Sequence, residues 1–314
     1  MRNLAELKSD ISNNVIPSAS AILIYGGPRT GKSLLASTIA KAPWIKRVYW
    51  FDLEKGLDTI IYANKTNTPD YLCLTEEELG KIIPINVIDG LNPGETVAAE
   101  TLLKVFTSKK PLHVSQKTGK VVPLPNEDTV EINYRALDAS DAIVIDSGSQ
   151  LSDSIVAMTE HELQEKQKGD KDVHGMLVYL AATEHMNALM SSIQAAKTNI
   201  IMVTHQYEIQ NQDESGSTLL PLFGSKNYVH KVAKYFGQIV YTSIALGKHR
   251  VGSASTYKSG VSTGSRTHVA LEKEREPNIN TLLTGGLLNV ETKIDPPSQL
   301  QSTTLVGKNN DRLR

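Results

Sequence analysis

The sequence predicts an α/β fold built on a mostly parallel sheet with helices on both faces. Short apolar runs such as Ala21–Tyr25, Ala142–Ile145 and Asn199–Val203 have the length and composition of buried strands. Longer segments typical of helices, such as Ser149–Gln167 and Met176–Ala196, separate these runs. Strands that alternate with helices indicate a parallel sheet whose two faces are both covered.

Further strands and helices are expected between these elements and after them. The additional strands are Arg47–Phe51, Ile82–Ile88, Gln238–Ala245 and Thr267–Leu271. The additional helices are Ser33–Lys41, Glu95–Phe106 and Lys226–Phe236, together with a short amphipathic helix over residues 3–12. With these additions the alternation of strand and helix extends over most of the chain.

One large domain is expected over residues 18–285, with an N-terminal helical arm over residues 1–17. Residues 108–137 interrupt the domain, because alternating residues flank Lys117–Lys120, a turn signal between two short strands. We interpret this segment as a β-hairpin insertion. The tail of residues 286–314 contains two adjacent prolines and many Ser, Thr, Asn and Gln residues, so we expect it to be flexible.

Composition limits the classes of protein to which the chain can belong. The 314 residues include one cysteine, Cys73, which excludes an intramolecular disulfide bond and a cysteine-cluster zinc site. No apolar run approaches the roughly 20 residues that span a bilayer, and the polar start of the chain does not resemble a signal sequence. We therefore expect a cytoplasmic protein with no membrane partner.

One segment matches the pattern GxxxxGK[ST] at every fixed position and lies between an expected strand and an expected helix. Its glycines let the backbone curl so that N–H groups point toward phosphate oxygens, and the helix start adds positive potential. Lys32 is expected to reach the β- and γ-phosphates and Ser33 to ligate a metal ion, which predicts binding of ATP with Mg²⁺. The predicted phosphate-binding residues are Gly26, Gly27, Pro28, Arg29, Thr30, Gly31, Lys32 and Ser33.

Two other expected strands end in carboxylates. Asp146 follows a fully apolar run, where an acid can hold Mg²⁺ beside the phosphate loop. The alternative is that Asp146 or Ser147 caps the helix that follows. Asp52 and Glu54 follow another strand, and a carboxylate at that position could orient the water molecule that attacks a γ-phosphate.

Four segments resemble the nucleotide-site motifs of the RecA family, in the same chain order. The phosphate loop is similar to that of the family, and Trp50–Asp58 resembles the segment that carries its catalytic glutamate. Ile143–Leu151 resembles the strand of its magnesium acid, and Ile200–Gln206 the strand whose terminal polar pair senses the γ-phosphate. The resemblance covers about residues 18–277 and implies a RecA-like P-loop core with Mg²⁺-dependent ATPase activity.

The resemblance also implies roles for individual residues. Glu54 would be the water-activating base, Asp146 the magnesium acid, and Gln206, beside His205, the sensor of the γ-phosphate. The compact size and the histidine are most similar to phage-type RecA-like ATPases linked to single-strand annealing and recombination. A phage-encoded protein of this kind would act in the cytoplasm of the bacterial host.

A weaker similarity concerns the basic residues of the segment Leu271–Pro277. It resembles the element that reaches the nucleotide of a neighbouring subunit, so Lys273 and Arg275 would stabilise transition-state charge in trans. That role requires a homo-oligomer, either a ring or a filament. The alternative is a charged strand or loop that faces solvent.

RecA-family proteins bind single-stranded DNA through two loops, which map here to about Gln164–Gly175 and Tyr207–Leu219. The first contains lysines that could meet phosphates. The second offers Tyr207 for base stacking but also carries three acidic residues. Single-stranded DNA is therefore the expected partner, and other recombination or replication proteins could join it.

Two other functions stay open at this point. The formal net charge of −1 and the acidic second loop favour a nucleotide-switched assembly or regulatory ATPase, similar to KaiC, that binds no DNA. A small-molecule kinase is the third hypothesis, although the chain lacks a recognisable Arg-rich substrate lid.

Overall fold

The computed structural model describes most of the predicted domain. The described residues are 19–63, 68, 72–92, 94–167, 174–210, 217–245, 248–252, 264–265 and 279. Three expected features lie outside them, namely the N-terminal arm, the strand Thr267–Leu271 and the C-terminal tail. None of the helices in the described part is long and apolar enough to cross a membrane.

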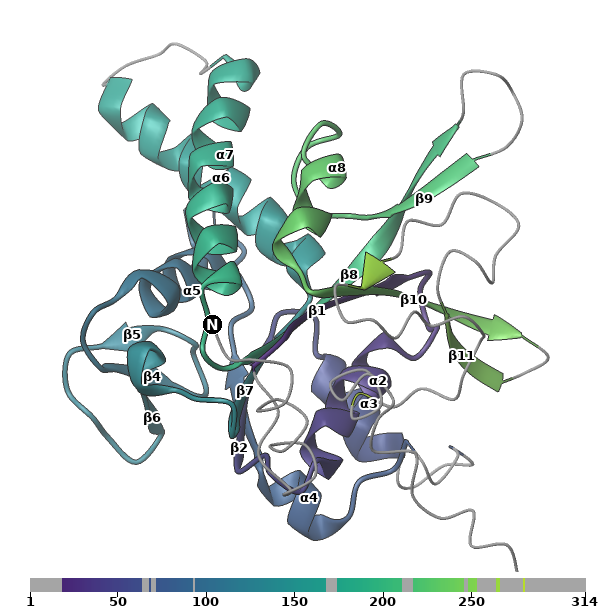
Figure 1. Cartoon of the computed structure of the whole chain (residues 1–314). Helices are drawn as coiled ribbons and strands as arrows, with labels where there is room; N and C mark the ends of the chain where they lie inside the picture. Colours follow the sequence, from purple (N-terminus) through teal and green to yellow (C-terminus); the bar gives the residue numbers. More distant parts are fainter. Residues whose placement is uncertain are drawn as a thin grey trace, which may run out of the picture.

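The central sheet is mostly parallel, as predicted (Figure 1). Its main strands are β1 (Ala21–Gly26), β2 (Arg47–Asp52), β3 (Ile82–Asn86), β7 (Asp141–Asp146), β8 (Asn199–Gln210), β10 (Gln238–Ala245) and β11 (Lys248–Gly252). They follow the spatial order β11-β10-β1-β8-β7-β2-β3. All neighbouring pairs are parallel except β11 with β10. A short strand, β12 (Gly264–Ser265), also pairs antiparallel with β10.

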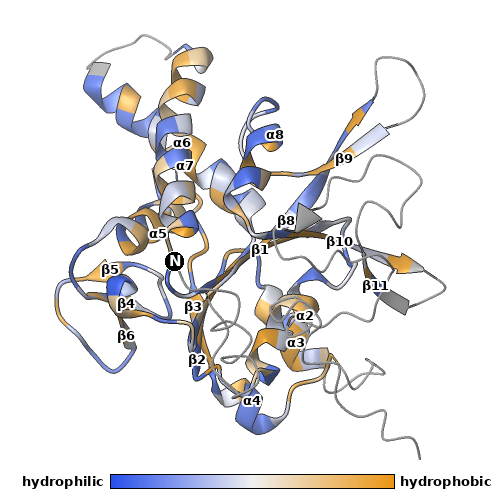
Figure 2. Cartoon of the chain, viewed as in Figure 1, coloured by the Kyte–Doolittle hydropathy of each residue, from blue (hydrophilic) through white to orange (hydrophobic). Residues whose placement is uncertain are grey.

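Helices cover both faces of this sheet. One face carries α2 (Lys32–Ser37), α3 (Gly56–Ala63) and α4 (Glu76–Gly80). The other carries α5 (Val97–Thr107), α6 (Gly148–Gln167), α7 (Gly175–Gln194) and α8 (Val229–Val232). Side chains of β1 alternate between the two cores, since Ile22 and Ile24 pack in the first and Leu23 in the second. Hydrophobic residues accordingly follow the strands of the sheet (Figure 2).

Some helices differ from the sequence-based expectation. α3 and α4 were not predicted, although Thr75 and Glu78 form a capping box at the start of α4 through mutual side-chain and backbone hydrogen bonds. Both helices are short, so their apolar patterns span too few turns to be distinctive. The expected helix Lys226–Phe236 is also shorter in the structure, because only α8 and the 3-10 turn Ala233–Tyr235 are helical.

The insertion contains more than the expected β-hairpin. β4 (Leu112–Ser115) and β5 (Val121–Val122) form the hairpin around Lys117–Lys120, and β6 (Thr129–Ile132) adds a third antiparallel strand on the other side of β4. The hairpin turn packs against α5, where the Thr101 hydroxyl donates to the Gly119 carbonyl at 2.7 Å. Residues Thr129–Ile132 were not predicted to be a separate strand, and they form β6 because they pair with β4.

The strand predicted over Asn199–Val203 is longer in the structure, where β8 extends to Gln210. β8 pairs antiparallel with β9 (Ser217–Pro221), so that the two form a ribbon that projects from the sheet (Figure 1). The expected loop Tyr207–Leu219 is therefore wrong at both of its ends. The RecA-family resemblance implied a loop here, but backbone pairing between the two segments satisfies the N–H and C=O groups and makes them strands.

Candidate nucleotide-binding site

Parallel pairing brings the predicted site residues to one edge of the sheet. Gly26 at the end of β1 is in register with His205 of β8, and Asp52 at the end of β2 is in register with Asp146 of β7. Strand ends that meet at the carboxyl edge of a parallel sheet are the usual position of a ligand in such folds. This edge therefore forms one candidate site, which is surrounded by the phosphate loop, Glu54, Asp146 and the end of β8.

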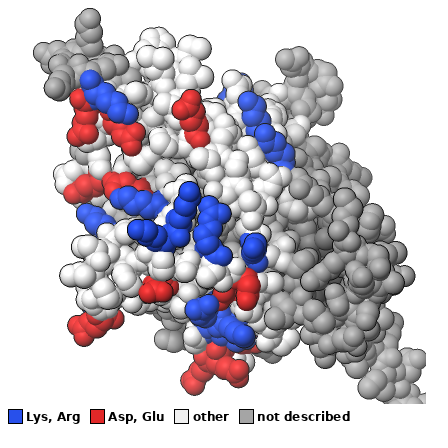
Figure 3. Space-filling model, turned by 60° about the vertical axis from the view of Figure 1, so that its left-hand side comes forward, with Lys and Arg blue, Asp and Glu red and all other residues white. Residues whose placement is uncertain are grey.

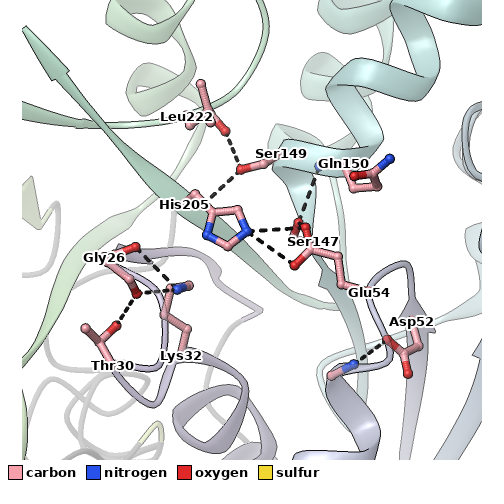
Figure 4. A network of polar contacts seen from close by, with 12 residues as sticks. Gly26, Thr30, Lys32, Asp52, Glu54, Ser147, Ser149, Gln150, His205 and Leu222 are labelled. Carbon is pink, nitrogen blue, oxygen red and sulfur yellow. Dashed lines mark hydrogen bonds and ion pairs between the residues drawn. The ribbon is translucent and has the colours of Figure 1, made fainter.

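The phosphate loop is curled around the amino group of its own lysine (Figure 4). Lys32 Nζ donates to the carbonyl oxygen of Gly27 at 2.7 Å and to that of Gly26 at 3.3 Å. Gly31, which precedes α2, has a φ of 87°, a conformation that favours glycine. Burial lowers the pKa of Lys32, while the nearby carboxylates Asp146 and Glu54 act in the opposite direction.

The loop is also held from the side by β10. Thr30 Oγ1 lies 2.7 Å from the hydroxyl oxygen of Thr242 and donates to the Gly27 carbonyl at 2.9 Å. A side chain at Gly26 would collide with Thr242, since a Cβ there would lie 2.4 Å from the Thr242 carbonyl oxygen. The close approach of the two strands therefore requires a glycine at the first position of the motif.

Asp146 and Ser33 converge beside Gly56, at the start of α3. A Cβ at Gly56 would lie 2.3 Å from Asp146 Oδ2 and 3.2 Å from Ser33 Oγ, so only glycine leaves these oxygens room. Asp146 is 3% exposed, and its Oδ2 has no hydrogen-bond partner among the described residues. Burial raises the pKa of Asp146 to about 6; Asp52 and Glu54 add to this shift, and a hydrogen bond with Ser33 and the charge of Lys32 oppose it.

These two oxygens suit a magnesium ion. Mg²⁺ prefers hard oxygen ligands and is usually bound by one or two protein groups together with water and substrate phosphates. Among the described residues no cluster of three His, Cys, Asp or Glu side chains could hold a metal by itself. An unpartnered, buried carboxylate oxygen next to the Ser33 hydroxyl therefore fits a cation that arrives with a nucleotide.

Glu54 stands opposite the phosphate loop and is held by two side chains (Figure 4). The Ser147 hydroxyl donates to Glu54 Oε1 at 2.5 Å, and His205 Nε2 lies 3.3 Å from each carboxylate oxygen. The hydrogen bond with His205 is the main cause of a lowered pKa of Glu54, and the one with Ser147 contributes. The carboxylate is thus oriented, ionised at neutral pH and still partly open to solvent.

Asp52, the other acid of this strand end, has a structural role. Its carboxylate accepts from the backbone N–H of Gly56 at 2.8 Å and of Leu57 at 3.3 Å, which satisfies donors at the start of α3. Of the two neighbouring acids, only Glu54 therefore has oxygens that can act on a molecule in the site.

Gln206 lies beside the phosphate loop, at the point where β8 leaves the sheet. Its Oε1 would be 3.6 Å from a Cβ at Gly27 and accepts from the Tyr241 hydroxyl at 2.9 Å. The neighbouring His205 backbone is fixed on both sides, because its N–H donates to Ser149 Oγ and its carbonyl accepts from Leu222 N–H. These contacts join the predicted sensor position, the start of α6 and the end of the ribbon.

Several functional contacts were missed by sequence reasoning. Ser147 was considered only as a helix cap, and Ser149, Tyr241 and Thr242 were not singled out at all. No local pattern could have marked Tyr241 or Thr242, since their partners Gln206 and Thr30 lie in segments that are distant in the chain.

Other predicted residues are not brought to the site by the described structure. Lys273 and Arg275 lie outside the described residues, as does the middle half of the first expected DNA loop, residues 168–173. The tip of the β8–β9 ribbon, residues 211–216, lies outside them too.

Comparison with known proteins finds similarity to solved structures and to one family. Among solved structures, similarity is found to flagellar accessory protein FlaH from Methanocaldococcus jannaschii (16% identity, 80% of this chain and 84% of that chain covered, TM-score 0.37). The RadB recombinase is similar at 12% identity, with 78% and 84% covered and a TM-score of 0.38. An ATPase from the type III secretion system of pathogenic bacteria is similar at 11% identity, with 72% and 52% covered and a TM-score of 0.37.

No curated protein matches the chain. The family described as the AAA domain matches residues 18–267, which is most of the chain and includes every described element of the nucleotide site. The chain therefore belongs to the AAA domain family of P-loop proteins.

Proposed function

We propose that this protein is an Mg²⁺-dependent ATPase that acts on single-stranded DNA in recombination or annealing, as a homo-oligomer. The observation that carries the ATPase part is the position of Glu54. Its carboxylate is held by Ser147 and His205 on the side of the site opposite Lys32, with the unpartnered oxygen of Asp146 between strands β2 and β8. This is the arrangement that hydrolysis of a γ-phosphate needs.

Each residue of the site has a distinct task in this proposal. Lys32 exchanges the carbonyls of Gly26 and Gly27 for phosphate oxygens, and the loop N–H groups hold the phosphates. Ser33 and Asp146 would hold Mg²⁺, which when bound offsets the charge that develops on the phosphates. Glu54 orients the attacking water and accepts its proton.

Two features of the chain support an effect of the nucleotide on DNA binding. Gln206 lies beside Gly27 and is also the first residue of the ribbon, where it pairs with Pro221. A contact between the Gln206 side chain and a γ-phosphate would therefore bear directly on the ribbon that leads to the second expected DNA loop. Loss of that contact after hydrolysis would loosen the ribbon.

The oligomer and its further partners rest on the family resemblance. Lys273 and Arg275 would complete the nucleotide site of a neighbouring subunit, and other recombination or replication proteins would bind the assembly. Size-exclusion chromatography with light scattering, with and without an ATP analogue, tests the oligomer, and a monomer under all conditions contradicts it.

A second function, a KaiC-like regulatory ATPase without DNA binding, is favoured by one observation. The described part of the ribbon, Tyr207–Gln210 and Ser217–Pro221, contains Glu208 and no Lys or Arg. A strand pair of this composition has no cation with which to meet a phosphate backbone.

Fluorescence anisotropy with a labelled single-stranded oligonucleotide distinguishes the two functions. The first predicts binding that strengthens with a non-hydrolysable ATP analogue and weakens as salt is raised. No binding with or without the analogue rejects the DNA function and favours the regulatory one. Binding that the analogue does not change rejects only the control of DNA binding by the nucleotide.

A further inference from the structure

Three segments that are distant in the chain meet at the end of α5. The Phe106 ring packs against the Tyr134 ring with centroids 4.8 Å apart, which joins α5 to the turn that follows β6. The Tyr134 hydroxyl in turn donates to the Ser192 carbonyl at 2.7 Å, which adds the end of α7. Side chains near Phe106, Tyr134 and Ser192 therefore share one surface.

This surface is rich in exposed basic residues. Figure 3 shows Lys and Arg side chains gathered near the centre of the side of the molecule that carries α5 and the insertion, with acidic side chains mostly around them. We use the term basic face for the exposed basic residues of the three segments. They are Lys104, Lys109, Lys110, Arg135 and Lys197.

Most of these charges have no ionic partner. Lys104 lies 3.5 Å from Glu100 of its own helix, but the other four residues form no ion pair within the part of the chain that the structure describes. Lys109 and Lys110 also lie beyond the last turn of α5, so its helix dipole does not account for them, and Arg135 belongs to the short 3-10 turn Tyr134–Ala136. The Arg135 guanidinium lies over the Tyr134 ring, 5.9 Å from its centroid, which leaves its N–H edges available.

The basic face lies at the edge of the sheet opposite the nucleotide site. α7 ends shortly before β8 begins, and the turn with Arg135 shortly precedes β7, so both segments lie at the amino ends of parallel strands. The phosphate loop and Asp146 lie at the carboxyl ends. With six residues in β7, the two edges are about 20 Å apart.

The chemistry of the surface selects the kind of partner. Protein interfaces need an apolar centre, yet the exposed large apolar side chains of α7 lie in its first two turns, far from its end at Gln194, and none is on α5 or the turn after β6. The basic face also presents no exposed aromatic ring on which a base could stack. What it offers is a group of cations, four of them without an ionic partner among the described residues, which suits a row of phosphates.

We propose that the basic face binds the sugar–phosphate backbone of single-stranded nucleic acid, without regard to base sequence or to the nucleotide in the ATP site. This rests on the proposed action on DNA and adds a contact region that is separate from the β8–β9 ribbon. A strand held here would stay bound through the hydrolysis cycle while the ribbon binds and releases.

The test is anisotropy with fluorescein-labelled oligothymidylate, titrated at several salt concentrations without nucleotide. Five phosphate contacts predict a slope of log affinity against log salt of about −3.5 for a single strand. The variant Lys109→Ala/Lys110→Ala/Arg135→Ala should lower the steepness by about 2 and weaken binding at low salt on the order of 10- to 100-fold. Its ATP hydrolysis without DNA should equal that of the wild type.

The control is Lys226→Ala/Lys231→Ala, which removes two exposed cations from the region of α8 and should change the slope little. If wild type binds and the basic-face variant has the same slope and affinity, the inference is wrong while the proposed function stands. If wild type hydrolyses ATP but binds no oligonucleotide with or without an ATP analogue, the DNA part of the proposed function falls as well, and an acidic protein becomes the better partner for this surface.

Discussion

Charged side chains are buried at one edge of the central sheet and exposed at the opposite edge. At the carboxyl edge, Lys32 and Asp146 are 8% and 3% exposed, and their pKa values are shifted mainly by burial. At the amino edge, the side chain of Lys104 is 57% exposed, and the rest of the basic face is exposed as well. A buried charge that awaits a ligand is costly to the folded protein, whereas an exposed charge in water costs almost nothing.

The difference indicates how each edge should respond to mutation. Single changes at the nucleotide edge should have large effects, because each group there acts in a low-dielectric environment on one ligand. Changes at the basic face should be small one at a time and should add up, because each cation contributes independently to a screened field.

Asp146→Asn should abolish hydrolysis and yet stabilise the nucleotide-free protein. The folded state raises the pKa of Asp146 from 3.8 to about 6, so ionisation of this group makes the free energy of unfolding fall as pH rises from about 4 to about 6. Asn carries no charge, so the free energy of unfolding at neutral pH should increase by about 3 kcal/mol. Urea unfolding measures this gain, which should shrink toward zero near pH 4; a variant less stable than wild type at neutral pH contradicts the account.

Lys32→Ala should weaken nucleotide binding on the order of 100-fold, since a hydrogen-bonded charge is worth about 1.5–3 kcal/mol. Isothermal titration with ATP and Mg²⁺ provides the measurement. Lys46→Ala removes an exposed lysine from the same region of the chain and serves as the control, with affinity equal to wild type. Equal affinity for the Lys32 variant would mean that the nucleotide does not bind at the loop.

Tyr241→Phe should reduce the preference for an ATP analogue over ADP by about 5- to 10-fold, the equivalent of one hydrogen bond. The Tyr241 hydroxyl donates to Gln206 Oε1 and so fixes which end of the amide faces the phosphate loop. In a Gln206→Ala background the same change should have no further effect on the ratio of affinities. An additional loss in that background would show that Tyr241 acts by another route.

Tyr134→Phe should have the smallest effect. It removes the hydrogen bond to the Ser192 carbonyl but keeps the ring packed on Phe106, so the free energy of unfolding should fall by about 1 kcal/mol. ATP hydrolysis should be unchanged, because this contact lies at the opposite edge from the nucleotide. A large loss of hydrolysis would mean that the two edges are coupled.

Sequence reasoning recovered the parts of the molecule whose signals are local. The phosphate loop has a strict spacing of residues, and continuous apolar runs marked β1, β7 and the buried half of β8. These predictions needed no knowledge of the sheet order, because each depends on a short segment and on its immediate neighbours.

The remaining parts depend on which strands are neighbours. The Ser147 hydroxyl reaches Glu54 across 93 positions of sequence and the Tyr241 hydroxyl reaches Gln206 across 35, contacts that only the strand order creates. The same reason explains the error over Tyr207–Leu219, which the family resemblance implied to be a loop and where pairing between β8 and β9 forms strands at both ends. Gly56 was overlooked because the reason for a glycine there is not local. A side chain at Gly56 would collide with Asp146, which lies on β7.

The most direct test of the central claim is steady-state ATP hydrolysis by wild type and Glu54→Gln, each with and without single-stranded DNA. Gln is nearly isosteric with Glu but cannot accept the proton of water, so the variant should bind ATP with near wild-type affinity and lose turnover by at least about 100-fold. Wild type should hydrolyse ATP faster when DNA is present. Turnover by Glu54→Gln equal to that of wild type would contradict the role of this carboxylate, and with it the interpretation of the site.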